Sequence, residues 1–548
     1  MKFLMHGFGS LIVILTLCLT CSEQAMAQST SSKKKVSDRH LDAQQYMEIL
    51  GSAITTLQGQ YVDTIDWNRV LTAGIDAMLH ELDPYTEFYS EEDQDEFKTM
   101  TTGEYGGVGA LIQQRGDTVF IANPYEDRPA QQAGARVGDG ILAIDGESMI
   151  KKTVSDVSDK LRGQAGTTFT VRVKRPFIDE PIDLKITRRK IVLDAVPYSG
   201  WLNDSIAYIN LSQFTDKAAQ DVQTALEEFK ASGKLKGLVF DLRGNGGGLL
   251  DEAVKLVGMF VPKGSLVVET KAKRPEWNIS YRTNTHPIEP DLRLVCLVDR
   301  NSASASEILS GALQDMDRAV IVGERSFGKG LVQSTRGLPF NTLIKFTSAK
   351  YYIPSGRCIQ AIKYSPDGQA VQIADSLTNV FHTANGREVR DGRGIKPDVE
   401  LKTKIMSNLA YFLDREYITA DYATRYRHEH ETIPAVADFH LSDAEYADFC
   451  EQALRHKNDS VLTKLLKVTD MAHELDSLKD EIREDIESEI ALRYYYQRGQ
   501  NERLVMGDKN ISAAAELLGD VARYEAILKP AAKEGSKEKG KGKNKKKK

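Results

Sequence analysis

Cysteine is scarce in this 548-residue sequence, and the cysteines that occur are not a set typical of disulfide-bonded proteins. The five of them are widely spaced, at Cys18, Cys21, Cys296, Cys358 and Cys450. Without the first two, which lie in the N-terminal segment described below, an odd number remains, and this is no disulfide framework. Because Cys296 lies in the apolar run 294–298, we expect a buried structural thiol there rather than a nucleophile.

A strong charge of one sign is also missing. The net charge is −6 over the whole sequence, and no basic face dominates it, so the composition argues against a nucleic-acid-binding protein. The exception is the lysine-rich C-terminal end, which repels itself and therefore predicts a disordered tail over 531–548. Such a tail either stays solvated or contacts an anionic membrane surface.

Long hydrophobic runs are absent except for one short run near the N-terminus. A charged start precedes apolar residues 11–19, and the sequence Ala-Met-Ala follows at 25–27. The run is shorter than the roughly 20 residues that span a bilayer, and this order of features is typical of a secretory signal peptide. We therefore predict a signal peptide over 1–27, cleaved after Ala27, and a periplasmic or secreted protein. A lipoprotein anchored through Cys21 is the alternative.

The remaining sequence predicts a multidomain protein of mixed α+β and α/β class. Residues 28–103 carry apolar side chains at helical spacing, up to a break at Asp83-Pro84. Residues 104–190 contain short β-branched runs between glycine turns and one short helix at 153–161. This pattern predicts a small, partly open β-barrel.

Two further regions follow. Residues 191–403 alternate strand-like and helical runs, with 344–352 as the last strand-like run, which predicts βαβ crossovers, a buried sheet, and a site at the carboxyl ends of its strands. Residues 404–530 are helical and charge-rich and carry no catalytic signature. This C-terminal extension mediates oligomerisation, gates substrate access, or is a plain helical appendage.

A serine-rich segment follows the predicted strand 292–298 and opens a helix. In the segment Ser302-Ala-Ser-Ala-Ser-Glu307, Ser304 lies at the strand end beside backbone N–H groups and the positive end of the helix dipole. A nucleophile is well placed there. The same spacing, Ser304-x-x-Glu307, is also a capping box, in which the serine only satisfies a helix donor. This segment alone does not decide between the two.

A lysine between two glycines follows the next predicted strand. Lys329 lies there between Gly328 and Gly330, which is an unusual place for a solvated charge. The segment 323–329 begins like a phosphate-binding loop, but Gly330 occupies the position that needs Ser or Thr to hold Mg²⁺. The sequence therefore argues against a nucleotide-dependent enzyme.

A glycine-rich turn, 243–248, follows the predicted strand 237–242. Leu249 stands where a dinucleotide-binding fingerprint needs its third glycine, so that motif fails. Backbone amides in such a turn suit an oxyanion hole.

Together these segments resemble the C-terminal processing (tail-specific) serine protease family with an embedded PDZ domain. The matching stretches occur in the family's order over about residues 40–400, at 241–248, 302–308, 311–315, 323–333, 351–357 and 392–398. The resemblance does not cover the C-terminal extension. It implies a serine endopeptidase that cleaves proteins near their C-termini.

Residue by residue, the resemblance places the family's nucleophile on Ser304 and its general base on Lys329. The glutamine that orients the base, one helical turn later, falls on Gln333, and a supporting acid falls on Asp315. A lysine with its ordinary pKa of about 10.4 is charged at neutral pH and is no base. Burial among glycines and apolar side chains disfavours the ammonium form, so the lysine becomes usable.

The resemblance also places the oxyanion donors. They are the amides of Ala305 and of either Gly247 or Gly248. The choice stays open because Gly246 stands where many relatives have Pro or Ser.

The stretch 104–190 resembles the family's PDZ domain, which implies binding of flexible, apolar C-termini of protein or peptide substrates. A glycine loop would hold the peptide carboxylate, a strand from Ala110 would accept the peptide by β-augmentation, and a helix would contact its last side chain. The stretch that begins at Arg162 resembles the turn through which such domains touch the protease core. The alternative is an ordinary turn that ends the helix. The glycine loop consists of Gly106, Gly107, Val108 and Gly109. The helix residues are Val154, Val157 and Leu161.

Other chemistries have little support in the sequence. No histidine lies between His286 and His382, which does not favour a Ser-His-Asp triad, and the pair at 428 and 430 lacks the spacing of a zinc helix. We therefore expect no metal and no cofactor, and we keep a homo-oligomer among the expected assemblies. The alternative function is a catalytically silent PDZ scaffold, against which the joint presence of Ser304, Lys329 and Gln333 argues.

Overall fold

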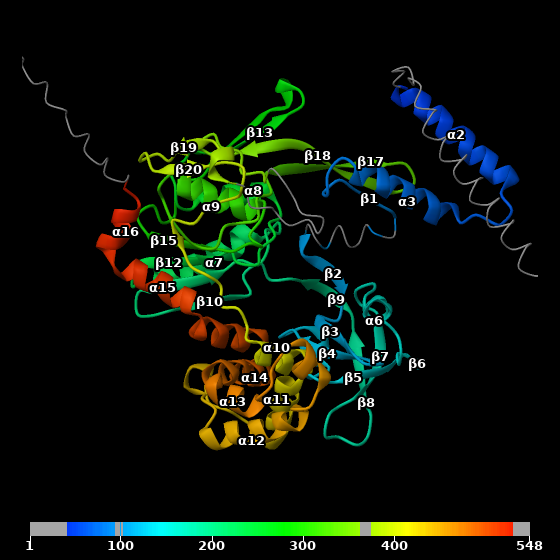
Figure 1. Ribbon diagram of the computed structural model, residues 1–548, viewed down its shortest axis with the longest axis vertical. Helices are drawn as coiled ribbons and strands as arrows, with labels where there is room; N and C mark the ends of the chain where they lie inside the picture. Colours follow the sequence, from blue (N-terminus) through cyan, green and yellow to red (C-terminus); the bar gives the residue numbers. More distant parts are fainter. Residues whose placement is uncertain (1–40, 92, 94–98, 100–101, 362–373, 530–548) are drawn as a thin grey trace, which may run out of the picture. The chain divides into compact units, whose positions relative to one another are not determined.

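The computed structural model describes residues 41–361, apart from 92, 94–98, 100 and 101, and residues 374–529 (Figure 1). The predicted signal peptide, residues 28–40 and the lysine-rich tail lie outside the described residues. The chain divides into two compact units, 1–77 and 78–548. Within the part that the structure describes, no helix combines the length and the apolar character needed to cross a bilayer.

The described part of the first unit, residues 41–77, is mainly helical, as predicted. α2 (Ala43–Gln60) begins with a capping box, in which the Asp42 carboxylate accepts the Gln45 N–H (2.9 Å) and the Gln45 side chain accepts the Asp42 N–H (3.1 Å). α3 (Trp67–His80) follows, and its last turn belongs to the second unit. None of the described α2 residues is buried.

The predicted helical stretch is interrupted by a strand. After the Asp83-Pro84 break, β1 (Glu87–Tyr89) is a strand that pairs antiparallel with β18 (Thr342–Tyr352). Its partner lies far along the chain, so local periodicity could not predict this strand.

The next region is a small antiparallel sheet with one main helix. Its strand order is β3-β4-β5-β7-β8, with β6 paired to β5, and a separate ladder joins β2 to β9. α6 packs against β3, and its apolar face forms one core with the inward side chains of the strands. The bounds are β2 (Glu104–Gly107), β3 (Ala110–Arg115), β4 (Thr118–Pro124), α5 (Pro129–Gln132), β5 (Gly140–Ile144), β6 (Glu147–Ser148), α6 (Val154–Leu161), β7 (Thr168–Lys174), β8 (Ile182–Thr187) and β9 (Arg189–Val192).

The largest region is built on a six-stranded sheet with the order β10-β11-β12-β15-β16-β21. β10 is antiparallel to β11, and the other neighbours are parallel. One face packs against α7, α8 and α9, which confirms the predicted βαβ arrangement. The bounds are β10 (Tyr198–Trp201), β11 (Ile206–Asn210), α7 (Ala218–Ala231), β12 (Gly237–Asp241), α8 (Leu250–Gly258), β15 (Arg293–Val298), α9 (Ala305–Asp315), β16 (Val320–Gly323) and β21 (Val399–Glu400).

The predicted strand 344–352 does not join that sheet. It forms β18, which belongs to a second, antiparallel sheet of order β1-β18-β13-β14, with β17 also paired to β18. β18 and β17 form a long hairpin that is labelled in Figure 1. The remaining bounds are β13 (Leu266–Ala272), β14 (Ile279–Arg282), β17 (Leu331–Leu338), β19 (Val380–His382) and β20 (Glu388–Arg390).

The C-terminal region is helical, as predicted, but its helices pack in two places. α10 to α14 bury a core of their own, whereas α15 and α16 cover the second face of the six-stranded sheet. There the Tyr524 hydroxyl donates to the Leu294 carbonyl (3.1 Å) and accepts the Leu294 N–H (3.0 Å). The bounds are α10 (Asn408–Arg415), α11 (Ile418–Glu429), α12 (Asp443–Ala453), α13 (Met471–Ser477), α14 (Lys479–Gly507), α15 (Lys509–Gly519) and α16 (Val521–Ile527).

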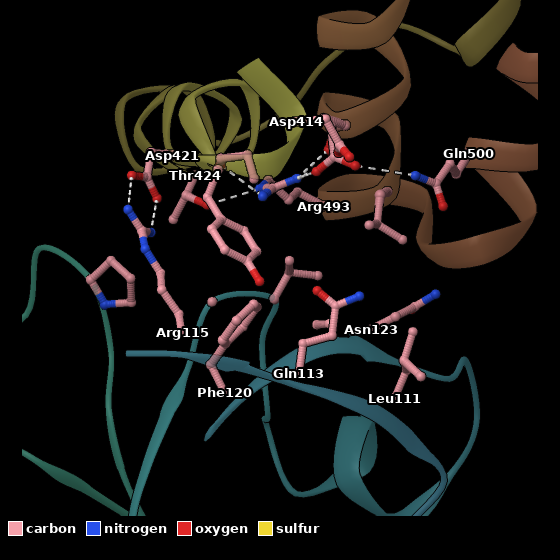
Figure 2. Close-up of a pocket in the computed structure, with 18 of the residues that line it drawn as sticks. Leu111, Gln113, Arg115, Phe120, Asn123, Asp414, Asp421, Thr424, Arg493 and Gln500 are labelled. Carbon is pink, nitrogen blue, oxygen red and sulfur yellow. Dashed lines mark hydrogen bonds and ion pairs between the residues drawn. The ribbon is translucent and has the colours of Figure 1, made fainter. Parts of the chain in front are cut away.

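The small sheet region and the C-terminal helices face each other across a cavity of about 360 Å³ (Figure 2). Arg115 on β3 forms a bidentate ion pair with Asp421 on α11 (2.7 and 2.8 Å). The Tyr417 hydroxyl donates to the Gln114 carbonyl (3.2 Å). Ile112, which points to the other side of β3, packs against the core of the sheet region. The helices therefore cover the outer face of this strand.

Candidate active site

Three loops that follow neighbouring parallel strands meet at one edge of the six-stranded sheet. The glycine turn lies between β12 and α8, Ser304 lies between β15 and α9, and Lys329 lies between β16 and β17. β12, β15 and β16 are adjacent and parallel. Their carboxyl ends therefore lie at one edge, which is where sites form in such sheets.

These loops line one cleft with a volume of about 610 Å³. Apolar side chains such as Ile308 and Leu331 line it too, and no histidine is among its described lining residues. In the part of the chain that the structure covers, no three His, Cys, Asp or Glu side chains gather as metal ligands would. The predicted site residues that the cleft brings together are Ser304, Ala305, Gly247, Gly248, Lys329 and Gln333.

Ser304 differs from the serines on either side of it. Its backbone has φ 56° and ψ −113°, a conformation that is costly for a residue with a side chain and that concentrates at functional sites. Ser302 and Ser306 are buried, and their hydroxyls donate to the carbonyls of Leu242 (2.8 Å) and Asn245 (2.9 Å). Of these alternating serines, Ser304 is the one that lines the cleft.

The glycine turn packs directly against Ser304. A Cβ atom on Gly247 would lie 2.8 Å from the Ser304 Cβ, and the φ of Gly247 is 104°, so a side chain does not fit there. The Gly247 N–H already donates to Asn245 Oδ1 (2.8 Å). The N–H groups of Gly248 and Ala305, by contrast, have no acceptor among the described residues. Both therefore remain available to a group bound in the cleft.

Lys329 is a largely buried amine. Burial and, to a smaller extent, the like charge of Lys345 lower the pKa of Lys329 to about 8. The carboxylates of Glu87, Glu307 and Asp83 act in the opposite direction. Near neutral pH, a pKa of this size leaves roughly a tenth of the lysine uncharged, whereas an ordinary lysine is almost wholly charged.

Glu307 connects the serine loop to the lysine loop. Its carboxylate is buried, and its Oε2 accepts the Ser304 N–H (2.9 Å) and the Lys329 N–H (2.8 Å). Its Oε1 accepts the Gly328 N–H (2.7 Å) and the Ser326 hydroxyl (2.5 Å). Burial raises the pKa of Glu307 to about 7, although these hydrogen bonds oppose the shift. From the sequence, only the contact between Glu307 and Ser304 could be expected, since the two residues have capping-box spacing. The other donors to Glu307 lie on the loop that carries Lys329.

Two predicted residues lie differently from expectation. Gln333 does not follow Lys329 by a helical turn, because it lies on the strand β17 and donates to Thr347 Oγ1 (3.4 Å). No hydrogen bond between described residues joins Gln333 to Lys329. Asp315 ends the 11-residue helix α9, about 16 Å from the end that carries Ser304. It is buried there in an ion pair with Arg357 (2.8 Å) and supports the packing of the helix.

The predicted peptide-binding residues lie together in the small sheet region. The loop connects β2 to β3, and β3 has a free edge because its one partner among the described strands is β4. A glycine loop, an edge strand and an adjacent helix form the arrangement that β-augmentation requires. Gly106 and Gly107 end β2, and Gly109 is buried in the loop that follows. Val108, Val157 and Leu161 belong to the core, and Val154 packs against it partly buried.

Among the described residues, Arg162 makes no hydrogen bond or ion pair with the protease core, where the resemblance places a contact. Its guanidinium lies over the Tyr105 ring of the same region, 5.2 Å from the ring centre. Glu104 contacts the core instead, through an ion pair with Lys217 at the start of α7 (3.0 Å), and it also pairs with Lys190 of its own region (2.5 Å). A single glutamate at a strand start carries no signal that a sequence pattern would reveal.

Family models match three parts of the chain. Residues 205–370 match the model described as "Peptidase family S41", and residues 120–175 match "PDZ domain". Residues 409–468 and 456–518 match "Probable PDZ-protease, C-terminal helical domain".

Individual proteins are similar over most of their length. The "Carboxy-terminal-processing protease" of Bartonella bacilliformis is 35% identical over 352 residues, which are 64% of this chain and 79% of the relative. The "Probable CtpA-like serine protease" of Staphylococcus haemolyticus is 31% identical over 381 residues, 69% of this chain and 75% of the relative. A solved structure, "Photosystem II D1 C-terminal processing protease", shares 29% identity over 64% of this chain and 86% of its own, with a TM-score of 0.36. Since these two relatives match over three quarters or more of their own length, and the family models match the catalytic and PDZ regions, the chain belongs to the S41 family of serine-type C-terminal processing peptidases with a PDZ domain.

Proposed function

We propose that this peptidase is an endopeptidase that uses Ser304 as nucleophile and Lys329 as general base. The observation that carries the proposal is the shared carboxylate of Glu307, which accepts the backbone N–H groups of both residues at the cleft. Glu307 thereby holds the serine and lysine loops in one fixed relation. The lowered pKa of Lys329, about 8, makes its amine a usable base.

The reaction then proceeds by acyl transfer. Ser304 Oγ bonds to the carbonyl carbon of the scissile peptide, and its proton passes to Lys329 Nζ. Lys329 returns the proton to the leaving amine as the C–N bond breaks. Water then attacks the resulting ester and gives its proton to Lys329 Nζ, which returns the proton to Ser304 Oγ as the ester C–O bond breaks.

The oxyanion that forms at the attacked carbonyl needs hydrogen-bond donors. The unused N–H groups of Ala305 and Gly248 support these two residues as the donors. The bond from the Gly247 N–H to Asn245 argues against Gly247 in this role.

We further propose that the PDZ region selects substrates by their exposed, flexible, apolar C-termini. The glycine loop, the free edge of β3 and the adjacent α6 support peptide addition at this edge. The sequence pattern at 1–27 supports export of the protein to the periplasm or the exterior.

Incubation of the purified mature protein with a protein substrate that has an apolar C-terminus tests the nucleophile. Ser304→Ala is expected to remove cleavage by several orders of magnitude and to leave substrate binding intact. Ser302→Ala and Ser306→Ala are matched controls, since they delete the same group from the adjacent buried serines. Full turnover by Ser304→Ala, or loss of turnover at unchanged stability in a control variant, would contradict the assignment. Binding without turnover by the wild type would identify a silent scaffold.

A further inference from the structure

A second lysine lines the cleft that holds Ser304 and Lys329. Lys345 lies on β18, and its side chain is 18% exposed. Its Nζ donates to the Tyr89 hydroxyl (3.0 Å) and forms an ion pair with Glu87. None of the sequence patterns indicated this residue.

The groups that hold Lys345 come from β1. Glu87 is the register partner of Lys345 in the β1–β18 ladder, and the Glu87 carboxylate also accepts the Tyr89 hydroxyl (2.7 Å). Two residues before Glu87, the ring of Tyr85 covers the other lysine, with its centre 4.4 Å from Lys329 Nζ. The short segment 83–89 therefore surrounds both amines.

The protonation of Lys345 follows from these contacts. Burial works against its charge, but the bonds to Glu87 and Tyr89 outweigh burial and raise the pKa of Lys345. Lys345 therefore remains an ammonium group in the pH range where Lys329 loses its proton.

We propose that Lys345 is a positioning residue for the reaction, whose fixed positive charge acts on the protonation of Lys329 and not on the substrate. Like charges disfavour each other, and the effect is larger where water is excluded. Lys345 lines the same cleft as Lys329. The charged groups that act on the Lys329 amine are Lys345 from β18, Glu87 from β1, Glu307 from α9 and Asp83 from the preceding loop. Lys345 is the one cation in this described set, and it opposes carboxylates that favour the ammonium form. The proposal rests on the proposed role of Lys329 as the base.

The test compares the pH dependence of kcat/KM from pH 6 to 10 in the wild type, Lys345→Gln and Lys345→Arg. Lys345→Gln removes the like charge, so the pKa of Lys329 rises. The rising limb of the pH–activity profile is therefore expected to move to higher pH by about half a pH unit to one unit. Activity at pH 7 then falls about three- to tenfold, and it returns to the wild-type level at the high-pH plateau. Lys345→Arg keeps the charge and is expected to keep the limb in place. Lys350→Gln, an exposed lysine on the same strand, is the matched control.

A readout without turnover accompanies the kinetics. In the Ser304→Ala background, the rate at which acetic anhydride acylates Lys329, followed by mass spectrometry across pH, reports the free amine directly. Lys345→Gln is expected to shift this profile up by the same amount. Glu87→Gln removes a carboxylate that favours the ammonium form, so it is expected to shift the profile down.

The outcomes separate the two proposals. Two results would overturn the role of Lys345 without contradicting the Ser304–Lys329 dyad. One is a loss of kcat/KM that is equal at every pH, and the other is an equal shift of the pH profile in Lys345→Gln and Lys345→Arg. Undiminished turnover by Lys329→Met would overturn the dyad itself, whatever the Lys345 variants do. Opposite shifts in Lys345→Gln and Glu87→Gln support the inference even where one variant is less stable.

Discussion

Arg243 and Asp508 form an ion pair (2.8 Å) between segments that lie 265 residues apart in the sequence. Arg243 begins the turn that carries Gly247 and Gly248, and its guanidinium also pairs with Asp241 (2.6 Å). Asp508 caps the N-terminus of α15. The C-terminal extension therefore supplies a counter-charge to the turn from which we infer an oxyanion donor.

Asp508→Asn removes the negative charge but keeps the helix cap, because asparagine is as good an N-cap as aspartate. We expect the free energy of unfolding to fall by about 1–3 kcal/mol, since Arg243 loses a partner in a partly buried site. We also expect a lower kcat. Urea unfolding and steady-state kinetics measure the two effects. Asp520→Asn is the control, since Asp520 caps α16 and has no ion pair among the described residues. Equal behaviour of the two variants would contradict a role for the ion pair.

The pH dependence of cleavage reports the lysine. With a Lys329 pKa of about 8, activity should rise through this pH and level off above it, because the neutral amine is the base. The Glu307 pKa of about 7 acts in the same direction, since its carboxylate accepts the hydrogen bonds that hold the loops. Lys329→Arg should be inactive at every pH, because arginine keeps its proton. A limb near pH 6.5 that disappears when a histidine is replaced would show that another base operates.

The buried lysine also affects stability. Its pKa is lower in the folded state than the ordinary 10.5, so the unfolded chain binds more protons between about pH 8 and 10.5 and stability rises with pH there. Below pH 8 the lysine destabilises the fold, and Lys329→Met should raise the free energy of unfolding at pH 7 by one to about 3 kcal/mol. Denaturant unfolding at pH 7 and pH 10 checks this, and the gain should shrink at the higher pH. A gain that does not change with pH would have a cause other than the charge.

Glu307→Gln tests the carboxylate that joins the two loops. Glutamine keeps the shape, but one of its terminal groups is a donor and faces N–H groups that need an acceptor. We expect stability to fall by about 2–4 kcal/mol and kcat to fall at least about tenfold. Ser310→Ala is the control, because it removes a buried hydrogen bond from the same helix (2.7 Å) without touching either loop. If kcat falls in both variants only in proportion to the loss of stability, the positioning role of Glu307 is contradicted.

Amidation of a substrate's C-terminus tests the glycine loop. The amide removes the charge that the loop amides are proposed to bind, so KM should rise markedly while kcat for a bound substrate changes less. Competition by a short free-acid peptide and by its amidated form gives the matched comparison. Equal inhibition by the two peptides would exclude recognition of the carboxylate.

The strand-end loops could be predicted from the sequence because each loop has a local signature, such as the glycines on both sides of Lys329. The wider contacts could not. Glu307 showed only its bond to the nearby helix start, since its other donors arrive with a different strand. Lys345 and Glu87 meet through the pairing of β1 with β18, and no local pattern encodes which strands pair. Gln333 was expected on a helical turn, but the hairpin pairing of β17 imposes an extended conformation.

The packing of α15 and α16 on the six-stranded sheet has a consequence for biosynthesis. Their side chains, including Leu517 and Tyr524, cover the sheet face formed by residues such as Val239 and Val295. A ribosome makes these helices last among the described elements, so a nascent chain that ends near residue 500 leaves this apolar face uncovered. The catalytic sheet therefore reaches its final form only after residues 509–527 have been synthesised, and until then the unfinished chain presents an aggregation-prone surface.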